Sequence, residues 1–481
     1  MIDIKQKGLV GIKWSAVERL LNIILNFAIS IIIARILSPS DYGIIGMIAV
    51  FTSLSIVFVE GGFSTALIRK LDRDETDFNT VFYYNIFSSI LLYVCIYYLA
   101  PYISIFYNIP ELTIISRVVG LNVIIGAFGT IQTAILTIHI DFKKQAKISS
   151  FSLIFSGLLG IFLAYEGFGV WALVFQGLLG TLLRSSLLWY YVGWKPKLIF
   201  SISSFKELFG FGSKIMLSGL LDSIFLNLYQ IVIGKKYNAS QLGFYTRANS
   251  LASLPSQNIT DIIIRVSYPL LSELQNDKKK LELNYRKTLR MLCYIVFPAM
   301  MFLFGFAHPL IQLLLTEKWL QAAPILQILC FSFMFFPINS INKVLFQVKG
   351  VSGLLLKIEI VKKSLIVIVL FVSAPFGVLA LCYGIVLTTV ISIGISTYYT
   401  SKLLEITFYS QIKDFISIFL ISVLTGIIVL SFSFFLDSSW MIIIFGGISG
   451  ILFFLSSSIF LKFDELNYLK NLVTDTKKGF F

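Results

Sequence analysis

Charged residues are scarce in this sequence. Asp, Glu, Lys and Arg make up 13% of its 481 residues, against about 25% in an ordinary soluble domain. Hydrophobic residues make up 57%, and the mean hydropathy is +0.87. This composition excludes a soluble globular protein, and we expect the chain to lie in a bilayer.

Cysteine and histidine are also rare, with four and two residues. The four cysteines each lie in a different apolar run: Cys95, Cys293, Cys330 and Cys382. Their spacing fits neither a metal site nor a disulfide framework. His139 and His308 lie at the ends of apolar runs, where an interfacial role is favoured over a proton relay. We therefore expect no metal and no cofactor.

Acidic residues are fewer than basic ones, 25 against 39, which gives a net charge of +14. A nucleic-acid-binding protein gathers its basic residues on a soluble face. Here they fall in short segments between apolar runs, a pattern typical of membrane topology. No nucleic-acid partner is expected.

Long apolar runs dominate the rest of the sequence. A helix needs roughly 20 mainly apolar residues to span the hydrocarbon core. The runs predict fourteen transmembrane helices, at about 13–36, 43–67, 80–101, 113–138, 147–165, 169–192, 207–234, 244–270, 288–306, 321–348, 354–372, 376–399, 414–436 and 440–461. The first run is too long for a signal-peptide core and lacks a small-residue cleavage site, so we expect it to be retained.

The basic residues orient these helices. With a cytoplasmic N-terminus, the inside segments hold 28 of the 39 basic residues and the outside segments hold five. Because basic residues are retained on the cytoplasmic side, both termini are predicted to be cytoplasmic.

The sequence also contains an internal repeat. "ARILSPSDYGIIGM" at 34–47 is followed 200 positions later by "GKKYNASQLGFYTR" at 234–247. The aligned pairs are Arg35 with Lys235, Ser40 with Ser240, Asp41 with Gln241 and Gly43 with Gly243. Helix 7 thus matches helix 1 in the same orientation, which predicts two parallel six-helix bundles, 1–206 and 207–413, around a central cavity, with helices 13 and 14 added at 414–481.

Polar stripes run along four of the predicted helices. They comprise Arg19, Asn22 and Asn26; Lys214, Ser218 and Asp222; Asn258, Asp261 and Arg265; and Asn339, Lys343 and Gln347. Ionisable groups at membrane depth are expensive and usually face a cavity or a partner. In one interpretation, the four stripes line a water-filled, positively charged cavity that binds an anionic, polar substrate. In the alternative, Arg19 and Lys214 snorkel to the headgroups and Asp261 pairs with Arg265.

Three further residues are candidates for gating or coupling. In the outer turn, Pro39 interrupts the first helix, Asp41 is expected to cap the second by accepting from its amides, and Gly43 allows a close approach. Arg35 lies near the negative end of the first helix. Glu60 precedes Gly61 and Gly62, which would permit a bend beside a carboxylate that could carry a coupling proton or cation.

Several motifs together resemble one family: "WSAVERLLN", "ARILSPSDYG", "EGGFSTALIRK", "YTRANSLASLPSQ" and "YPLLSELQND". In this order they are similar to the polysaccharide-exporter branch of the multidrug/oligosaccharidyl-lipid/polysaccharide (MOP) superfamily, nearest to Wzx-type flippases and colanic-acid-type exporters. Drug-exporting relatives have twelve helices, whereas flippases of lipid-linked sugars typically have fourteen.

This resemblance implies a flippase for lipid-linked oligosaccharide units of polysaccharide or O-antigen biosynthesis, working by alternating access in the bacterial inner membrane. The implied substrate is a polyprenyl (pyro)phosphate-linked oligosaccharide. Membrane lipids, a coupling cation (H⁺ or Na⁺) and other glycan assembly proteins are further partners that it allows. A multidrug-type exporter is the alternative. A membrane-embedded glycan polymerase is disfavoured, because the outer loops are short and carry no carboxylate cluster, so we expect no enzymatic activity.

Overall fold

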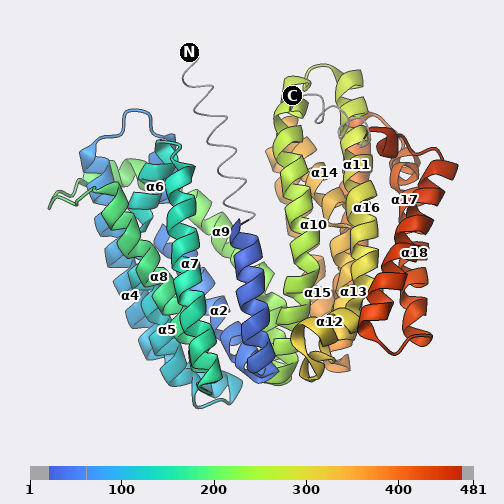
Figure 1. The fold of residues 1–481 in the computed structure, drawn as a ribbon. Coiled ribbons are helices and arrows are strands. Elements are labelled where there is room, and N and C mark those ends of the chain that lie inside the picture. The colour runs from blue at the N-terminus through green and yellow to red at the C-terminus, as the bar shows by residue number, and fades with distance from the viewer. Residues whose placement is uncertain (1–20, 61, 469–481) are drawn as a thin grey trace, which may run out of the picture. The chain divides into compact units, whose positions relative to one another are not determined.

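The computed structural model describes residues 21–60 and 62–468, and this part of the chain is built from helices without β-strands (Figure 1). The helices are Leu21–Ile36, α2 (Pro39–Glu60), α3 (Phe63–Arg69), α4 (Glu75–Tyr107), α5 (Leu112–Ala127), α6 (Thr130–Ile138), α7 (Phe142–Tyr165), α8 (Val170–Val192), α9 (Ile202–Lys236), α10 (Ala239–Glu273), α11 (Lys278–Gly305), α12 (Ala307–Leu315), α13 (Ala322–Met334), α14 (Phe336–Val348), α15 (Ser352–Ser373), α16 (Val378–Leu404), α17 (Phe408–Ser431) and α18 (Ser439–Phe460).

The chain divides into two compact units, Met1–Gly243 and Phe244–Phe481. Unit 1 holds the helices up to α9 and the first residues of α10, and unit 2 holds the rest of α10 and the helices up to α18. The division falls inside α10. The boundaries expected from the repeat, at 206/207 and 413/414, stay predictions.

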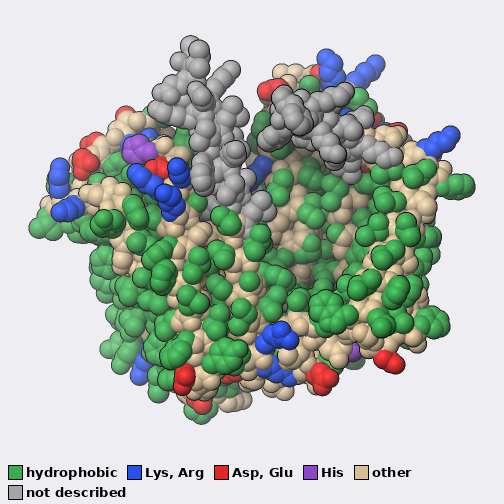
Figure 2. Space-filling model, in the orientation of Figure 1, with side chains coloured by type: hydrophobic (Ala, Val, Ile, Leu, Met, Phe, Trp, Pro, Cys, Tyr) green, Lys and Arg blue, Asp and Glu red, His purple; other side chains and the backbone are tan. Residues whose placement is uncertain are grey.

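The described residues contain eleven helices, some of them broken, that are long and apolar enough to cross a membrane. On the face shown in Figure 2, hydrophobic side chains cover the middle of each unit and charged side chains gather toward the ends. The protein is therefore an all-α, multi-pass membrane protein. The count of fourteen is not confirmed: helix Leu21–Ile36 is short in its described part, and α10 and α15 are not among the eleven. In α15 the charges of Lys357, Glu359, Lys362 and Lys363 interrupt the apolar run.

Two predicted spans are broken in the middle at matching places. The run 113–138 is split between α5 and α6 at Phe128 and Gly129, and the run 321–348 is split between α13 and α14 at Phe335. Glycine loosens the first helix, and Pro337 begins the second half of the other. Side chains satisfy backbone carbonyls freed near each break: Trp189 Nε1 donates to Phe128 O (2.8 Å) and Ser256 Oγ to Phe333 O (2.6 Å).

Helix caps repeat as well. Asp74 accepts from the backbone N–H of Asp77 at the start of α4, and Asp277 accepts from that of Lys280 at the start of α11. The hydrogen bonds from Lys280 lower the pKa of Asp277 below its ordinary value. Ser201 caps α9 in the same way, and so does Thr407 at the start of α17, which lies outside the repeat. The internal repeat is thus present at the level of local hydrogen bonds.

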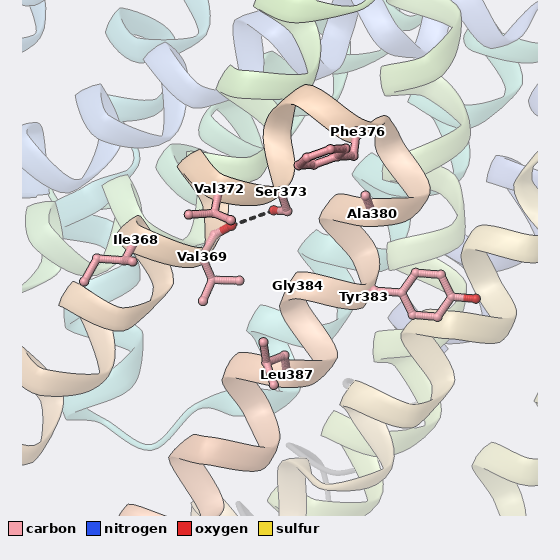
Figure 3. A pocket seen from close by; sticks show the side chains of 9 residues that line it. All are labelled: Ile368, Val369, Val372, Ser373, Phe376, Ala380, Tyr383, Gly384 and Leu387. Carbon is pink, nitrogen blue, oxygen red and sulfur yellow. Dashed lines mark hydrogen bonds between the residues drawn. The ribbon is translucent and has the colours of Figure 1, made fainter.

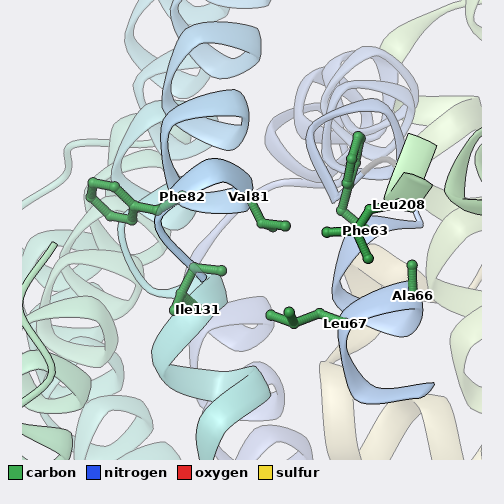
Figure 4. Packing of buried hydrophobic residues seen from close by; sticks show 7 residues of the cluster. All are labelled: Phe63, Ala66, Leu67, Val81, Phe82, Ile131 and Leu208. Carbon is green, nitrogen blue, oxygen red and sulfur yellow. The ribbon is translucent and has the colours of Figure 1, made fainter. Parts of the chain in front are cut away.

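Packing inside unit 1 is illustrated by a buried cluster that fixes α3 after its break from α2 (Figure 4). Phe63, Ala66 and Leu67 of α3 pack against Val81 and Phe82 of α4, Ile131 of α6 and Leu208 of α9. In lipid, helices associate through close packing of shapes rather than through hydrophobic burial alone. The close packing of these side chains therefore holds the four helices α3, α4, α6 and α9 together.

Candidate functional site

The two copies of the repeated turn, at 34–47 and 234–247, contact each other in unit 1. A Cβ atom on Gly43 would lie 1.7 Å from the carbonyl oxygen of Ala239, and a Cβ atom on Gly243 would lie 1.8 Å from that of Pro39. Each glycine thus faces the first residue of the other helix, at the start of α2 and of α10. We call this contact the glycine crossing, and the end of the helices where it lies the Gly43 end. The close approach expected at Gly43 is present.

Both helices that form the glycine crossing are capped in the same manner. Asp41 N donates to Ser38 Oγ (3.3 Å) at the start of α2, and Gln241 N donates to Asn238 Oδ1 (2.8 Å) at the start of α10. At α2, Asp41 Oδ2 also accepts from Ser38 N (2.8 Å) and Ser38 Oγ (2.6 Å). The expected role of Asp41 needs a correction. Because α2 begins at Pro39, Ser38 is the N-cap residue, and Asp41 is its partner three positions later, as in a capping box. Arg35 is exposed in the last turn of helix Leu21–Ile36.

Helix α9 packs closely on α2 along its length. A Cβ on Gly62 would lie 2.3 Å from Gly212 O, and further along Ser53 Oγ bonds Ser223 Oγ (3.1 Å) and accepts from Asn227 Nδ2 (3.2 Å). α2 ends at Glu60, and Gly62 has a φ of 69°. The bend expected beside Glu60 is therefore present as a helix break.

The opposite face of α9 carries one predicted stripe. Lys214, Ser218 and Asp222 are all exposed, whereas Ser223 is buried toward α2. On the first helix, Asn22 Oδ1 accepts from Ser150 Oγ of α7 (3.5 Å), and Asn26 donates to Asn22 O (2.9 Å). The α9 stripe is thus exposed in the structure, whereas Asn22 is hydrogen-bonded to α7. Arg19 lies outside the described residues.

In unit 2, two stripes run along neighbouring helices. Ser256 of α10 bonds the carbonyl of Phe333 in α13, and Lys349 Nζ, just after α14, donates to Gln275 O beyond α10 (2.8 Å). These two contacts place Arg265 level with the segment 339–343. Arg265 and Lys343 are exposed, and Asp261 and Asn339 are half-buried. The structure therefore brings the polar stripes of α10 and α14 to a common depth.

A further cation joins this region from α15. Lys362 Nζ lies 3.3 Å from Asn339 Oδ1 and 3.8 Å from Glu359 Oε1, its side chain is 12% exposed, and the charge of Lys343 acts on it. Asn339 Oδ1 also accepts from Ser396 Oγ of α16 (3.3 Å). We call these five residues the Asn339 cluster. The 28 basic residues assigned to the inside segments include Lys362, although it lies within the predicted span 354–372. Its i, i+3 spacing from Glu359 is the signal that marks it as part of a polar helix face.

In each unit by itself, one end is named here the Asp277 end: in unit 1 it is the end where α4 begins, and in unit 2 it is the end where α11 begins. In unit 1, Lys70 Nζ contacts Asp77 (3.0 Å) and Glu207 (3.0 Å), and the hydrogen bonds to Glu207 and then Asp77 raise the pKa of Lys70. In unit 2, Arg286 of α11 forms a two-pronged pair with Asp414 of α17 (2.7 and 2.8 Å). The sequence reading missed both networks, which fasten helices to one another.

Among the described residues, His, Cys, Asp and Glu side chains form no group of three or more that could hold a metal ion. The polar groups on these helices are instead dominated by cations and amides. Such an arrangement can bind an anion or a polar solute at membrane depth, since arginine and lysine both donate to phosphate oxygens.

Comparison with known proteins decides the family. Residues 32–324, more than half of the chain, match the family model described as "Polysaccharide biosynthesis protein". The chain belongs to this family. It is 27% identical over 428 residues to an uncharacterised membrane protein in the cps region of Klebsiella pneumoniae, covering 87% of each chain. It is 24% identical over 335 residues to the lipopolysaccharide biosynthesis protein WzxC of Escherichia coli, covering 68% and 67%.

Solved structures agree on the fold. The inward closed conformation of the lipid II flippase MurJ is similar with a TM-score of 0.78 at 18% identity, covering 93% of this chain and 98% of that one. An inward-facing multidrug transporter of the MOP superfamily has a TM-score of 0.63 at 18% identity, covering 80% and 96%. The fold is therefore the one seen in these two solved structures, and the family match confirms the resemblance to polysaccharide exporters.

Proposed function

We propose that this protein is a flippase that moves a polyprenyl (pyro)phosphate-linked oligosaccharide from the cytoplasmic to the outer leaflet of the bacterial inner membrane. Relatives that the chain matches are named for lipopolysaccharide and teichuronic acid biosynthesis and for succinoglycan transport. The observation that carries the proposal is the presence of exposed cations on the apolar helices of a protein in this family.

The positions of these cations support capture from the cytoplasmic leaflet. Lys214, Arg265, Lys343 and Lys362 each lie in the half of their helix, or helix pair, nearer the Asp277 end, which the charge distribution predicts to be cytoplasmic. A cation at that depth attracts the phosphate of a lipid-linked sugar while the tail remains in the bilayer. Asn22, Asn26, Asp222, Asp261 and Asn339 would offer hydrogen bonds to the sugar.

Alternating access would then expose the sugar on the outside. The glycine crossing, with Arg35 and Asp41 beside it, is proposed to close the outer end of the path, and Glu60 at the helix break is proposed to take up a coupling H⁺ or Na⁺. An inside-negative potential also assists the outward movement of an anion, by about 2.3 kcal/mol per charge and 100 mV.

The test uses cells that lack their own flippase but retain the glycosyltransferases and the polymerase. Expression of this chain should restore polymeric surface glycan. Without it, single lipid-linked repeat units should accumulate, inaccessible to a membrane-impermeant glycosidase added to spheroplasts.

Two results would overturn the proposal. In matched cells that keep their own flippase but lack the polymerase, restoration of polymeric glycan by this chain would identify a polymerase. Efflux of ethidium without any change in glycan would identify a multidrug exporter.

A further inference from the structure

An apolar trough runs between α15 and α16 in unit 2, beside the turn that joins them (Figure 3). Its volume is about 470 Å³. Ile368, Val369 and Val372 line it from α15, and Ala380, Tyr383 and Leu387 line it from α16. The lining offers hydrocarbon and aromatic surface over the length of about two helical turns.

The trough is preformed and has no unsatisfied polar group. β-Branched side chains such as Ile368, Val369 and Val372 hold one preferred rotamer in a helix, so that wall is stiff. Of the two hydroxyls in the lining, Ser373 Oγ donates to the carbonyl of Val369 (2.7 Å), and that of Tyr383 points away from α15 (Figure 3). A Cβ on Gly384 would lie 3.0 Å from both Ser373 Oγ and Val369 Cγ1. The small residue Gly384 is thus used to pack α16 against α15 and is not left for a helix of another protein.

The rim of the trough is open to its surroundings. Val372 is 64% exposed, Tyr383 is 63% exposed and Leu387 is 52% exposed. In a bilayer such a surface is covered by hydrocarbon. The remaining question is which hydrocarbon chain lies there.

The Asn339 cluster points to the occupant. Val369 and Ser373 follow Lys362 by seven and eleven residues, so they share its face of α15, beginning about 10 Å further along. Lys362 and Lys343 bring two positive charges against the one carboxylate of Glu359. A lipid with an anionic head at this cluster would lay its tail directly into the trough.

We propose that the trough binds the polyprenyl tail of the lipid-linked substrate while the Asn339 cluster holds its phosphate. This inference rests on the proposed function and adds a tail-binding site to it. A bulk phospholipid is the competing occupant, which the experiment separates from the substrate.

The experiment places the photoreactive residue p-benzoylphenylalanine at Leu387 in the full-length protein, reconstituted in nanodiscs of phosphatidylethanolamine and phosphatidylglycerol. The probe is tritiated polyprenyl phosphate. The matched control places the same residue at Ile427 of α17, which is 53% exposed but lies outside the trough. We expect cross-linking at position 387 to exceed that at 427, and to be competed by unlabelled polyprenyl phosphate but not by extra phosphatidylglycerol.

In a second arm of the experiment, the variant Ala380→Trp fills the trough. Its control is Leu424→Trp, on the exposed surface of α17. Ala380→Trp should lower cross-linking at position 387 by about tenfold, because excluding roughly two methylene groups of the tail already costs one decade of affinity. Leu424→Trp should leave it unchanged. The competition measurement does not depend on this variant folding.

Equal labelling at positions 387 and 427, or equal competition by phosphatidylglycerol, would overturn the tail site. Surface glycan display by the unsubstituted protein is measured in parallel, because it tests the proposed function independently of the tail site. Restored display without specific cross-linking rejects the trough alone, whereas absence of display rejects the flippase.

Discussion

Gly43 and Gly243 occupy positions where any other side chain would enter a neighbouring backbone. A Cβ atom added to either glycine would lie closer to Ala239 or Pro39 than real Cβ atoms ever lie to a neighbour. The obstructing atoms belong to the backbone and cannot rotate away. The spacing of 200 residues between them led to the repeat, and the structure supplies its physical reason: both helices begin at one crossing that only glycine permits.

Gly43→Ala should therefore destabilise the protein by about 3 kcal/mol or more, the upper range for forced overpacking, and Gly243→Ala should do the same. Because both act on one crossing, the double variant should cost less than the sum of the two. Thermal unfolding of the purified protein in detergent measures this. Gly210→Ala is the control, since a Cβ there meets nothing within 4 Å. A neutral Gly43→Ala would show that the crossing is not closed in the membrane.

Lys362 shows where residue-level prediction ends. It lies in the predicted span 354–372 together with Lys357 and Lys363, and the sequence does not tell which of the three side chains meets a neighbouring helix. Only tertiary packing of α15 against α14 and α16 turns Lys362 toward Asn339. The polar stripes on α9 and α14 could be predicted from the sequence, because the residues of each stripe lie on one helix and recur every four positions.

At the scale of elements, α17 is fastened to α11 by the pair of Arg286 with Asp414. Asp414 is buried, with 5% of its side chain exposed, and accepts two hydrogen bonds from the guanidinium. Removing one partner of a buried pair leaves an uncompensated charge, which typically costs 3–5 kcal/mol. This contact fixes the first of the two helices that follow the repeat.

Asp414→Ala is expected to destabilise the protein by about 3 kcal/mol, and Arg286→Lys should not substitute for the two-pronged arginine. Glu282→Gln is the matched control, because Glu282 contacts the same Arg286 at 3.5 Å from a partly exposed position, where about 0.5 kcal/mol is expected. A double-mutant cycle from thermal unfolding gives the coupling. Equal effects of Asp414→Ala and Glu282→Gln would contradict the assignment.

Helix existence was predictable from the sequence, but helix continuity was not. The run 113–138 contains Gly120, Gly126 and Gly129, and the sequence does not tell which of them breaks the helix, because the carbonyl of Phe128 at the break accepts from Trp189 of another helix. The cap at Ser38 was predicted only in part, since both Ser38 and Asp41 are cap-forming residues and the start of α2 decides between them.

At the scale of the whole molecule, the distribution of basic residues predicts the orientation in the membrane. Cysteine introduced at Ser40 or Ser240, beside the glycine crossing, should be labelled in intact cells by an impermeant thiol reagent. Cysteine at Lys144 or Lys279 should be labelled only after the membrane is opened. The unsubstituted protein controls for the four native cysteines. Labelling of Ser40 from the inside alone would invert the topology.

The central claim is that cations on the spanning helices capture an anionic lipid-linked sugar, and one measurement tests it most directly. Surface glycan is quantified in cells that depend on this protein and carry Arg19→Gln, Lys214→Gln, Arg265→Gln and Lys343→Gln together. The control makes the same charge change at four predicted loop lysines, Lys144, Lys195, Lys279 and Lys462. At wild-type protein abundance, the variant with the four substituted helix cations, the cavity variant, should show about tenfold less surface glycan or lower still, because each 1.4 kcal/mol of lost binding costs one decade of affinity. The variant with the four substituted loop lysines should retain its surface glycan. Undiminished display in the cavity variant would contradict the account.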